Sequence, residues 1–323
     1  MAEFTFEIEV YSDTICPWCY IGKKTLEKAI ATYTAQHPAV DFKLTWKPFM
    51  LWPTAKTSAY QKGAILHAIY GPRAPVMFER LARLGALHGI DFRWEGKSGN
   101  SRDSHKLILL AMEQDDDDTR SSSSPSPPGL EPTSTTATAT TTATTTTTNN
   151  STATTNPLLT YKQTKQERTI AHLFASAFEQ GQDLSSRAFL ARAAVTLGLV
   201  GSEEEALAYL EQQADEEDPE AGRRQPGSGT GPARRGLAKR VDESSARARQ
   251  IGMTAVPSYV VQGRWQVGGM QGEDVWLRIF EKVRATKSGK KNEEGSSLDG
   301  LTTREEQPTV TNGGMQKEST EIR

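Results

Sequence analysis

The chain has 323 residues, of which 36% are hydrophobic, and its formal net charge is −2. A hydrophobic fraction this low predicts that part of the chain does not fold, and the near-zero net charge gives no dominant field that would draw the protein to nucleic acid or to a membrane surface.

The N-terminal residues predict a strand followed by a helix. Residues 6–12 alternate apolar and polar side chains, and residues 17–36 place Ile21, Leu26 and Ile30 on one helical face. No basic segment followed by an apolar run precedes them, and no stretch reaches the roughly 18 apolar residues of a membrane span. We therefore expect a soluble, cytoplasmic protein without nucleic-acid or membrane partners.

Further along the chain, a second strand is expected at residues 42–51, followed by a block of helices. The helical pattern covers residues 58–70, 72–88, a segment that starts near Ser101, 163–180, 186–197, 202–212 and 237–251. Two short strands around Gly263 and a helix over residues 273–285 complete the pattern.

Three segments interrupt these elements. Residues 115–156 join an Asp run to Ser/Pro and Thr/Ala tracts, which bury too little apolar surface to offset the entropy of ordering them. We expect this insert to be disordered and the Asp run to be a solvated loop. Residues 214–235 read as a flexible loop, and residues 287–323 as a disordered tail.

The order of elements predicts an α/β fold. Residues 1–55 and 236–286 supply the strands of one small sheet domain, and residues 56–213 form a helical domain inserted in its middle.

Cys16 and Cys19 are the two cysteines of the chain. Cys16 follows a predicted strand and opens a predicted helix, and Pro17 suits the first helical position. Free N–H groups and the helix dipole stabilise a thiolate at that place, which makes Cys16 a competent nucleophile. Cys19 lies one turn further on and can resolve a mixed disulfide. The spacing therefore predicts thiol–disulfide exchange.

Three other interpretations compete for this pair. A structural zinc site needs four ligands, which one C-x-x-C and five scattered histidines do not supply. A structural disulfide would close a very small loop and is rare inside cells. Two inert, buried thiols remain an alternative.

A second feature supports the redox interpretation. Val256–Pro257 lies directly before a predicted strand. Such a proline often only marks the start or the edge of a strand in a sheet. A cis proline would instead expose the preceding backbone groups to a ligand. Beside a C-x-x-C motif we favour the cis form.

Five segments together resemble the DSBA-like thioredoxin family, in its FrnE-like branch. They are VYSDTICPWCYIGKKTLEKAI, WKPFML, RDSHKLILLA, AFEQGQDLSSRAFLARAAVTLGL and GMTAVPSYVVQGRWQVGGMQ. The resemblance implies a thioredoxin-like fold with an inserted α-helical domain and the activity of a protein-disulfide oxidoreductase or isomerase.

The resemblance also implies roles for individual residues. Cys16 would be the nucleophile, Cys19 the resolving thiol and Pro257 the cis proline. Pro17, Trp18 and the backbone of Val256 would contact a thiol or disulfide substrate, either a protein or a small molecule. No cofactor or metal is required, and glutathione is a plausible redox partner. The oligomeric state stays open, with a homodimer as one possibility.

The chain departs from the family pattern in its Thr/Ala tract and its Pro/Gly/Arg spacer, which are either surface excursions or a gene-model artefact. The same superfamily includes 2-hydroxychromene-2-carboxylate isomerases and kappa-class glutathione transferases, which typically place a serine where Cys16 stands. A glutathione-dependent transferase or isomerase is therefore the alternative function, and a non-catalytic binding module is the second alternative.

Several other polar and aromatic residues are expected to have no catalytic role. His105, near a helix start, is the histidine most open to a function at the cleft. Lys23 and Lys24 follow the motif but read as ordinary exposed lysines. The remaining residues are expected to pack: His67, His88, His172, Trp46, Trp52, Trp94, Trp265 and Trp276.

Overall fold

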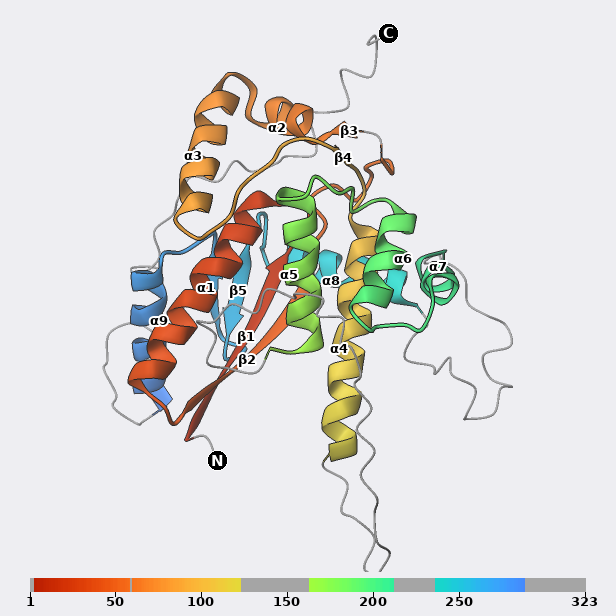
Figure 1. Cartoon of the computed structure of the whole chain (residues 1–323). Helices are drawn as coiled ribbons and strands as arrows, with labels where there is room; N and C mark the ends of the chain where they lie inside the picture. The colour runs from red at the N-terminus through yellow and green to blue at the C-terminus, as the bar shows by residue number, and fades with distance from the viewer. Residues whose placement is uncertain (1–2, 59, 123–162, 212–235, 288–323) are drawn as a thin grey trace, which may run out of the picture.

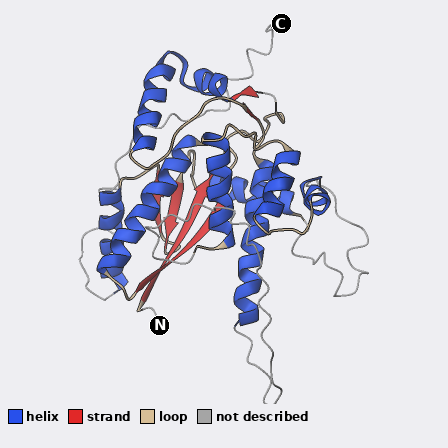
Figure 2. Ribbon diagram, viewed as in Figure 1, coloured by secondary structure: helices blue, strands red, loops and turns tan. Residues whose placement is uncertain are grey.

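The computed structural model describes residues 3–58, 60–122, 163–211 and 236–287. Within them, a mixed sheet has the strand order β2-β1-β5-β6, and helices surround it (Figure 1) (Figure 2). The strands of this sheet are β1 Phe4–Ser12, β2 Val40–Pro48, β5 Ser258–Val261 and β6 Trp265–Gly268, and a separate pair is formed by β3 Tyr60–Gln61 and β4 Lys97–Ser98. The helices are α1 Pro17–Gln36, α2 Lys62–Tyr70, the 3-10 turn η1 Gly71–Arg73, α3 Ala74–Ala86, α4 Arg102–Ser122, α5 Lys165–Phe178, α6 Arg187–Thr196, α7 Glu203–Glu211, α8 Leu237–Gln250 and α9 Glu273–Lys287.

The main sheet contains strands from both the N-terminal and the C-terminal parts of the described chain. Strands β1 and β2 run parallel because α1 carries the chain back between them. Strand β5 pairs antiparallel with β1, and β6 pairs antiparallel with β5. The inserted helices therefore leave from β2 and return to β5, as the order of predicted elements indicated.

One face of the sheet carries an aromatic core. The ring of Phe6 on β1 lies 4.9 Å from that of Phe42 on β2 and 5.0 Å from that of Phe280 on α9. Tyr33 of α1 packs edge-on against Phe280 at 5.3 Å. Helices α1 and α9 thus cover this face, and burial of these large rings contributes much of the stability.

Helix α5 closes the open edge of β2 with a side chain. The amide of Gln166 accepts the backbone N–H of Trp46 at 2.9 Å and donates to the Trp46 carbonyl at 2.9 Å. Gln166 is buried and makes the pair of hydrogen bonds that a neighbouring strand would make.

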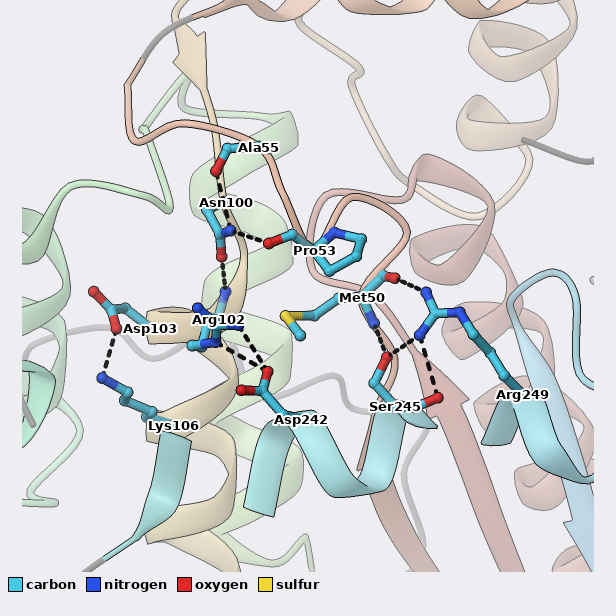
Figure 3. A network of polar contacts seen from close by, with 10 residues as sticks. All are labelled: Met50, Pro53, Ala55, Asn100, Arg102, Asp103, Lys106, Asp242, Ser245 and Arg249. Atoms are coloured by element: carbon cyan, nitrogen blue, oxygen red, sulfur yellow. Dashed lines mark hydrogen bonds and ion pairs between the residues drawn. The ribbon is translucent and has the colours of Figure 1, made fainter. Parts of the chain in front are cut away.

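Polar contacts fix the inserted helices to the sheet domain at the start of α4 (Figure 3). The Asn100 amide donates to the carbonyls of Pro53 and Ala55, in the segment after β2. Arg102 donates from Nε and Nη2 to Oδ1 of Asp242 on α8, at 3.0 and 2.8 Å. The beginning of α4 is therefore tied to segments on both sides of it in the sequence.

Helix α8 contacts the segment directly after β2 (Figure 3). Ser245 Oγ accepts the backbone N–H of Met50 at 3.0 Å, and Arg249 donates to the Met50 carbonyl at 2.5 Å. Because Met50 lies in the segment that leads toward the inserted helices, α8 fixes the path of the chain as it leaves the sheet.

The predicted start of the disordered insert at residue 115 is wrong. Helix α4 continues to Ser122 and includes the Asp run. The carboxylate of Asp115 accepts the backbone N–H groups of Lys165 and Gln166 at 2.7 and 2.9 Å, so it caps the start of α5. Asp118 pairs with the Lys165 ammonium at 3.0 Å. These contacts with a distant segment stabilise a helix that the local composition did not predict.

Two predicted helices begin differently in the structure. The segment expected to be helical from residue 58 first forms strand β3, whose Tyr60 pairs with Ser98 of β4. The helix expected from residue 72 is preceded by the 3-10 turn η1, whose first residue, Gly71, has a positive φ of 53°. Strand β3 pairs with a segment almost forty residues away, and such pairing leaves no local periodicity in the sequence. The sequence pattern therefore did not predict β3.

Several predicted segments lie outside the described residues. These are residues 123–156 of the insert, the loop 214–235 and the tail from residue 288. Lys287, the first residue of the predicted tail, is the last residue of α9.

Candidate active site

Cys16 lies where strand β1 passes into helix α1. It is the N-cap residue of α1, with an extended backbone (φ −95°, ψ 113°), and Pro17 follows in the first turn. The Cys16 carbonyl accepts the backbone N–H of Cys19 at 3.1 Å, which closes that turn. The predicted position of Cys16 at a helix start is confirmed, and the positive end of the helix dipole favours an anion there.

The two thiols differ in their surroundings. Both cysteines are free, and the exposed fraction is 5% for Cys16 and 1% for Cys19. Burial raises the pKa of the Cys19 thiol well above its ordinary value, and the neighbouring Cys16 thiol raises it further. The backbone of Asp13 and the hydroxyl of Ser12 lower the pKa of Cys19, but by less. Cys19 is therefore the inner thiol, held in its protonated form.

The segment before β5 reaches the outer thiol. The Val256–Pro257 peptide bond is cis, as the sequence predicted. The Val256 carbonyl lies 3.7 Å from Cys16 Sγ and accepts its S–H. The antiparallel pairing of β5 with β1 produces this contact, because it places Ser258 opposite Tyr11 near the end of β1.

Trp18 connects the motif to the inserted helices. Its indole Nε1–H donates to the hydroxyl of Tyr70, at the end of α2, over 3.0 Å. The guanidinium of Arg80 on α3 lies 5.3 Å from the indole ring. Helices α2 and α3 thus lie over the N-terminal end of α1 (Figure 1). Trp18 is buried between them rather than exposed at the surface.

A cavity of about 70 Å³ opens beside Cys16. The motif, the segment before β5 and α2 all contribute to its lining. The lining residues on the motif side include Cys16, Pro17, Trp18 and Val256, and those from α2 are Lys62, Ile65, Leu66, Ile69 and Tyr70. Mostly apolar walls around one thiol suit a small substrate that is largely removed from water.

The predicted site residues occupy different positions around this cavity. Cys16, Pro17, Trp18 and Val256 line it. Cys19 lies behind Cys16 in the core, and Pro257 follows Val256 without being a lining residue. Their roles in binding and catalysis stay predictions.

The wall formed by α2 was missed by sequence reasoning. The segment AILHAIY carries no motif, and its apolar residues read as ordinary helix packing. Lys62 is 7% exposed, and burial lowers its pKa to about 8. Burial also raises the pKa of Tyr70 to about 12, and the nearby Cys16 acts in the same direction. Trp52, expected to be a packing residue, lines the cavity as well.

His105 supports the loop of the motif from behind. Its Nε2 lies 3.4 Å from Oδ1 of Asp13, and both side chains are fully buried. Asp13 in turn accepts the backbone N–H of Leu51 at 2.7 Å through Oδ2 and that of Cys16 at 3.1 Å through its carbonyl. His105 is thus near the motif, but it is not among the residues that line the cavity.

The prediction that Lys23 is an ordinary exposed lysine is wrong. Lys23 is buried and forms an ion pair with Glu27, four residues further along α1. Lys24 is partly buried, and burial lowers its pKa. The second turn of α1 is packed closely, because the flanking residues Ile21, Gly22, Thr25 and Leu26 are buried.

Comparison with known proteins relates the N-terminal part of the chain to one family. The family model described as DSBA-like thioredoxin domain matches residues 7–123. These residues are similar to that family, and the predicted thioredoxin-like fold with inserted helices is confirmed.

Individual proteins match this chain over a short segment or at low sequence identity. An uncharacterized protein of Bacillus subtilis (strain 168), YwbO, is 40% identical over 50 residues, which cover 16% of this chain and 22% of that relative. The crystal structure of a probable DsbA oxidoreductase from Streptomyces coelicolor is 20% identical, covers 89% of this chain and 92% of its own, and has a TM-score of 0.58. The cytosolic disulfide reductase DsbM from Pseudomonas aeruginosa, solved with GSH, is 13% identical and covers 86% of this chain and 98% of its own, with a TM-score of 0.43. The Streptomyces structure shows a shared fold.

Among the described residues, no three or more His, Cys, Asp or Glu side chains gather in a way that could hold a metal ion. No helix in the described ranges combines the length and the apolar character needed to cross a membrane.

Proposed function

We propose that the protein is a thiol–disulfide oxidoreductase in which Cys16 is the nucleophile and Cys19 the resolving thiol. The observation that carries this proposal is the asymmetry of the pair: Cys16 lines a cavity at the N-cap of α1, and Cys19 is buried behind it. A nucleophile must reach its substrate, whereas a resolving thiol must reach only the nucleophile.

The proposed cycle has two steps, attack on the substrate disulfide and resolution of the mixed disulfide. The Cys16 thiolate attacks one sulfur of a substrate disulfide, a bond forms between the two sulfurs, and the other half leaves as a thiolate that takes up a proton. Cys19 then loses its proton and attacks Cys16 Sγ, which forms the Cys16–Cys19 disulfide and releases the second substrate thiol. The substrate gains two electrons and two protons from the dithiol. The reverse direction oxidises a substrate dithiol, and repeated exchange isomerises disulfides.

The surrounding residues have supporting roles in this proposal. The Val256 backbone and Pro257 receive the chain or group attached to the substrate sulfur, and Pro17 and Trp18 form the wall beside it. No cofactor takes part in the exchange, and glutathione is the proposed redox partner. We place the reaction in the cytoplasm, as expected from the sequence.

The first experiment is a redox titration of the pair. We expect a reversible two-electron transition between about −120 and −270 mV when the protein is equilibrated in graded glutathione buffers and its thiols are counted by alkylation. The Cys19→Ser variant should accumulate a mixed disulfide on Cys16, because the resolving step is removed, and the Cys16→Ser variant should not. If no Cys16–Cys19 disulfide forms at any ratio of the buffer, the proposal fails.

A glutathione-dependent transferase or isomerase is the second candidate, favoured by the small apolar cavity beside Cys16. The two functions differ in their need for Cys19. Conjugation or isomerisation would survive the Cys19→Ser substitution, whereas turnover of disulfides would stop. A binding module without catalysis would retain its partner after both thiols are alkylated.

A further inference from the structure

Of the described residues that line the cavity beside Cys16, Lys62 alone carries a charge. Most of the other lining residues are apolar, among them Ile65, Leu66 and Phe178. An ammonium group in such surroundings is costly unless hydrogen bonds or a counter-ion compensate for the lost water. The cavity therefore combines a reactive thiol with one cationic group.

The hydrogen bonds of Lys62 do not neutralise its charge. Nζ donates to the carbonyl of Ala177 at 2.5 Å and to that of Gln182 at 3.2 Å, and both acceptors are neutral. An ammonium has three N–H donors, so two acceptors leave one donor for a further partner.

No carboxylate of the described residues lies within ion-pair distance of the Lys62 ammonium. Asp183 and Glu95 act on it from further away and raise its pKa, but burial outweighs them and lowers the pKa to about 8. A bound anion would supply the counter-ion that the protein leaves out.

A purely structural role of Lys62 is the competing explanation. Ala177 lies in the last turn of α5, where unpaired carbonyls and the negative end of the helix dipole attract a cation. That role accounts for the two carbonyl contacts. It does not account for the place of Lys62 among the residues that line the same cavity as Cys16.

We propose that Lys62 binds a carboxylate of the substrate, so that the preferred substrates are small organic disulfides that carry an acidic group. This proposal rests on the proposed function, because the sulfur of the same substrate must react with Cys16. The burial of the thiol favours a small molecule, because Cys16 is 5% exposed and shares its cavity with residues of α2. A folded protein would reach this thiol poorly.

The test uses three disulfides of similar size and different charge. These are 3,3′-dithiodipropionate, which is anionic, bis(2-hydroxyethyl) disulfide, which is neutral, and cystamine, which is cationic. Pre-reduced protein is mixed with an excess of each, and the rate constant for formation of the Cys16–Cys19 disulfide is measured by quenched alkylation. Each rate constant is divided by that of free dithiothreitol with the same disulfide, which removes differences in intrinsic reactivity.

We expect the wild-type protein to react in the order anionic, neutral, cationic. Lys62→Gln keeps an N–H donor near Ala177 but removes the charge, and it should lower the rate constant for dithiodipropionate by about ten-fold, as for loss of one charged hydrogen bond. The rate constant for the neutral disulfide should change less than about two-fold. Lys62→Arg keeps the charge and should retain most of the preference for the anion.

Two results would overturn the inference while the proposed function stands. One is an equal loss with the anionic and neutral disulfides in Lys62→Gln, which would assign Lys62 to the structure of α5. The other is a wild-type protein that shows no preference for the anion, a result that needs no variant. Failure of the wild-type protein to react with all three disulfides would instead refute the proposed function itself.

Discussion

Two residues separate Cys16 from Cys19, yet the surroundings of the two thiols differ. Cys16 is the N-cap of α1 and lines the cavity, whereas Cys19 lies in the core one turn later. Burial is the largest contribution to the raised pKa of Cys19. In the proposed cycle Cys19 must therefore give up its proton as it attacks, and it stays unreactive toward reagents in solution.

The state of Cys19 can be tested in the Cys16→Ser variant, where it is the remaining thiol. We expect iodoacetamide to modify Cys19 much more slowly in the native variant than in the same variant unfolded in urea, and its titration to lie above the ordinary value of 9.0. Because the folded state holds this proton more tightly than the unfolded state, the stabilising effect is complete below pH 9 and is lost as the pH rises further. The free energy of unfolding should fall above pH 9 more steeply for Cys16→Ser than for the Cys16→Ser/Cys19→Ser double variant. Equal titration of Cys19 in the native and unfolded variant would contradict this assignment.

At the scale of elements, helix α5 is fixed at both ends by other parts of the chain. Thr164 accepts the N–H of Glu167, and the Glu167 side chain accepts the N–H of Thr164, which makes a capping box. The carboxylate of Asp115 on α4 accepts two further N–H groups of the same turn. At the other end Lys62 contacts the last turn. Helix α5 also supplies Phe178 to the cavity wall, so its position bears on the site.

Removal of the cap should weaken the protein by a measurable amount. We expect Thr164→Ala to lower the free energy of unfolding by about 1 kcal/mol, because one backbone N–H loses its acceptor. Thr164→Ser keeps the hydroxyl and serves as the matched control, with little change expected. Urea denaturation followed by circular dichroism at 222 nm measures both. An equal loss in the Ala and Ser variants would show that the methyl group, not the hydrogen bond, stabilises this turn.

At the scale of the whole molecule, the sheet and the inserted helices share one hydrophobic core. Buried residues of β1, α1, α4, α5 and α8 belong to the same cluster. Tyr20 of α1, directly after the motif, stacks on Phe174 of α5 at 5.1 Å. Arg102 and Asp242 join α4 to α8 across the same boundary. The helical insertion is therefore packed into the fold that it interrupts.

A shared core predicts cooperative unfolding. We expect the loss of helical signal at 222 nm and the exposure of Cys19 to alkylation to have the same urea midpoint, although most helices belong to the insertion and Cys19 to the sheet domain. The Cys16→Ser variant provides a single thiol for this measurement. An early loss of helix while Cys19 stays protected would show that the two parts unfold independently.

Local pattern and resemblance were sufficient for much of this protein. The alternation in residues 6–12, the helix that opens at Pro17 and the strands around Gly263 follow from side-chain periodicity, which acts over a few residues. The cis Val256–Pro257 bond was predicted from its position before a strand in a chain that also contains a C-x-x-C motif.

The tertiary structure alone decided what surrounds Cys16. The wall of α2 and its Lys62, the Gln166 contact at the edge of β2 and the continuation of α4 past Asp115 all depend on residues that are far apart in the sequence. Periodicity reports which face of a helix is buried, but not which distant surface buries it. The sequence by itself therefore determined the position of the cysteine pair at a helix start and the fold around it, whereas the packing of the inserted helices decided the shape and the charge of the cavity beside Cys16.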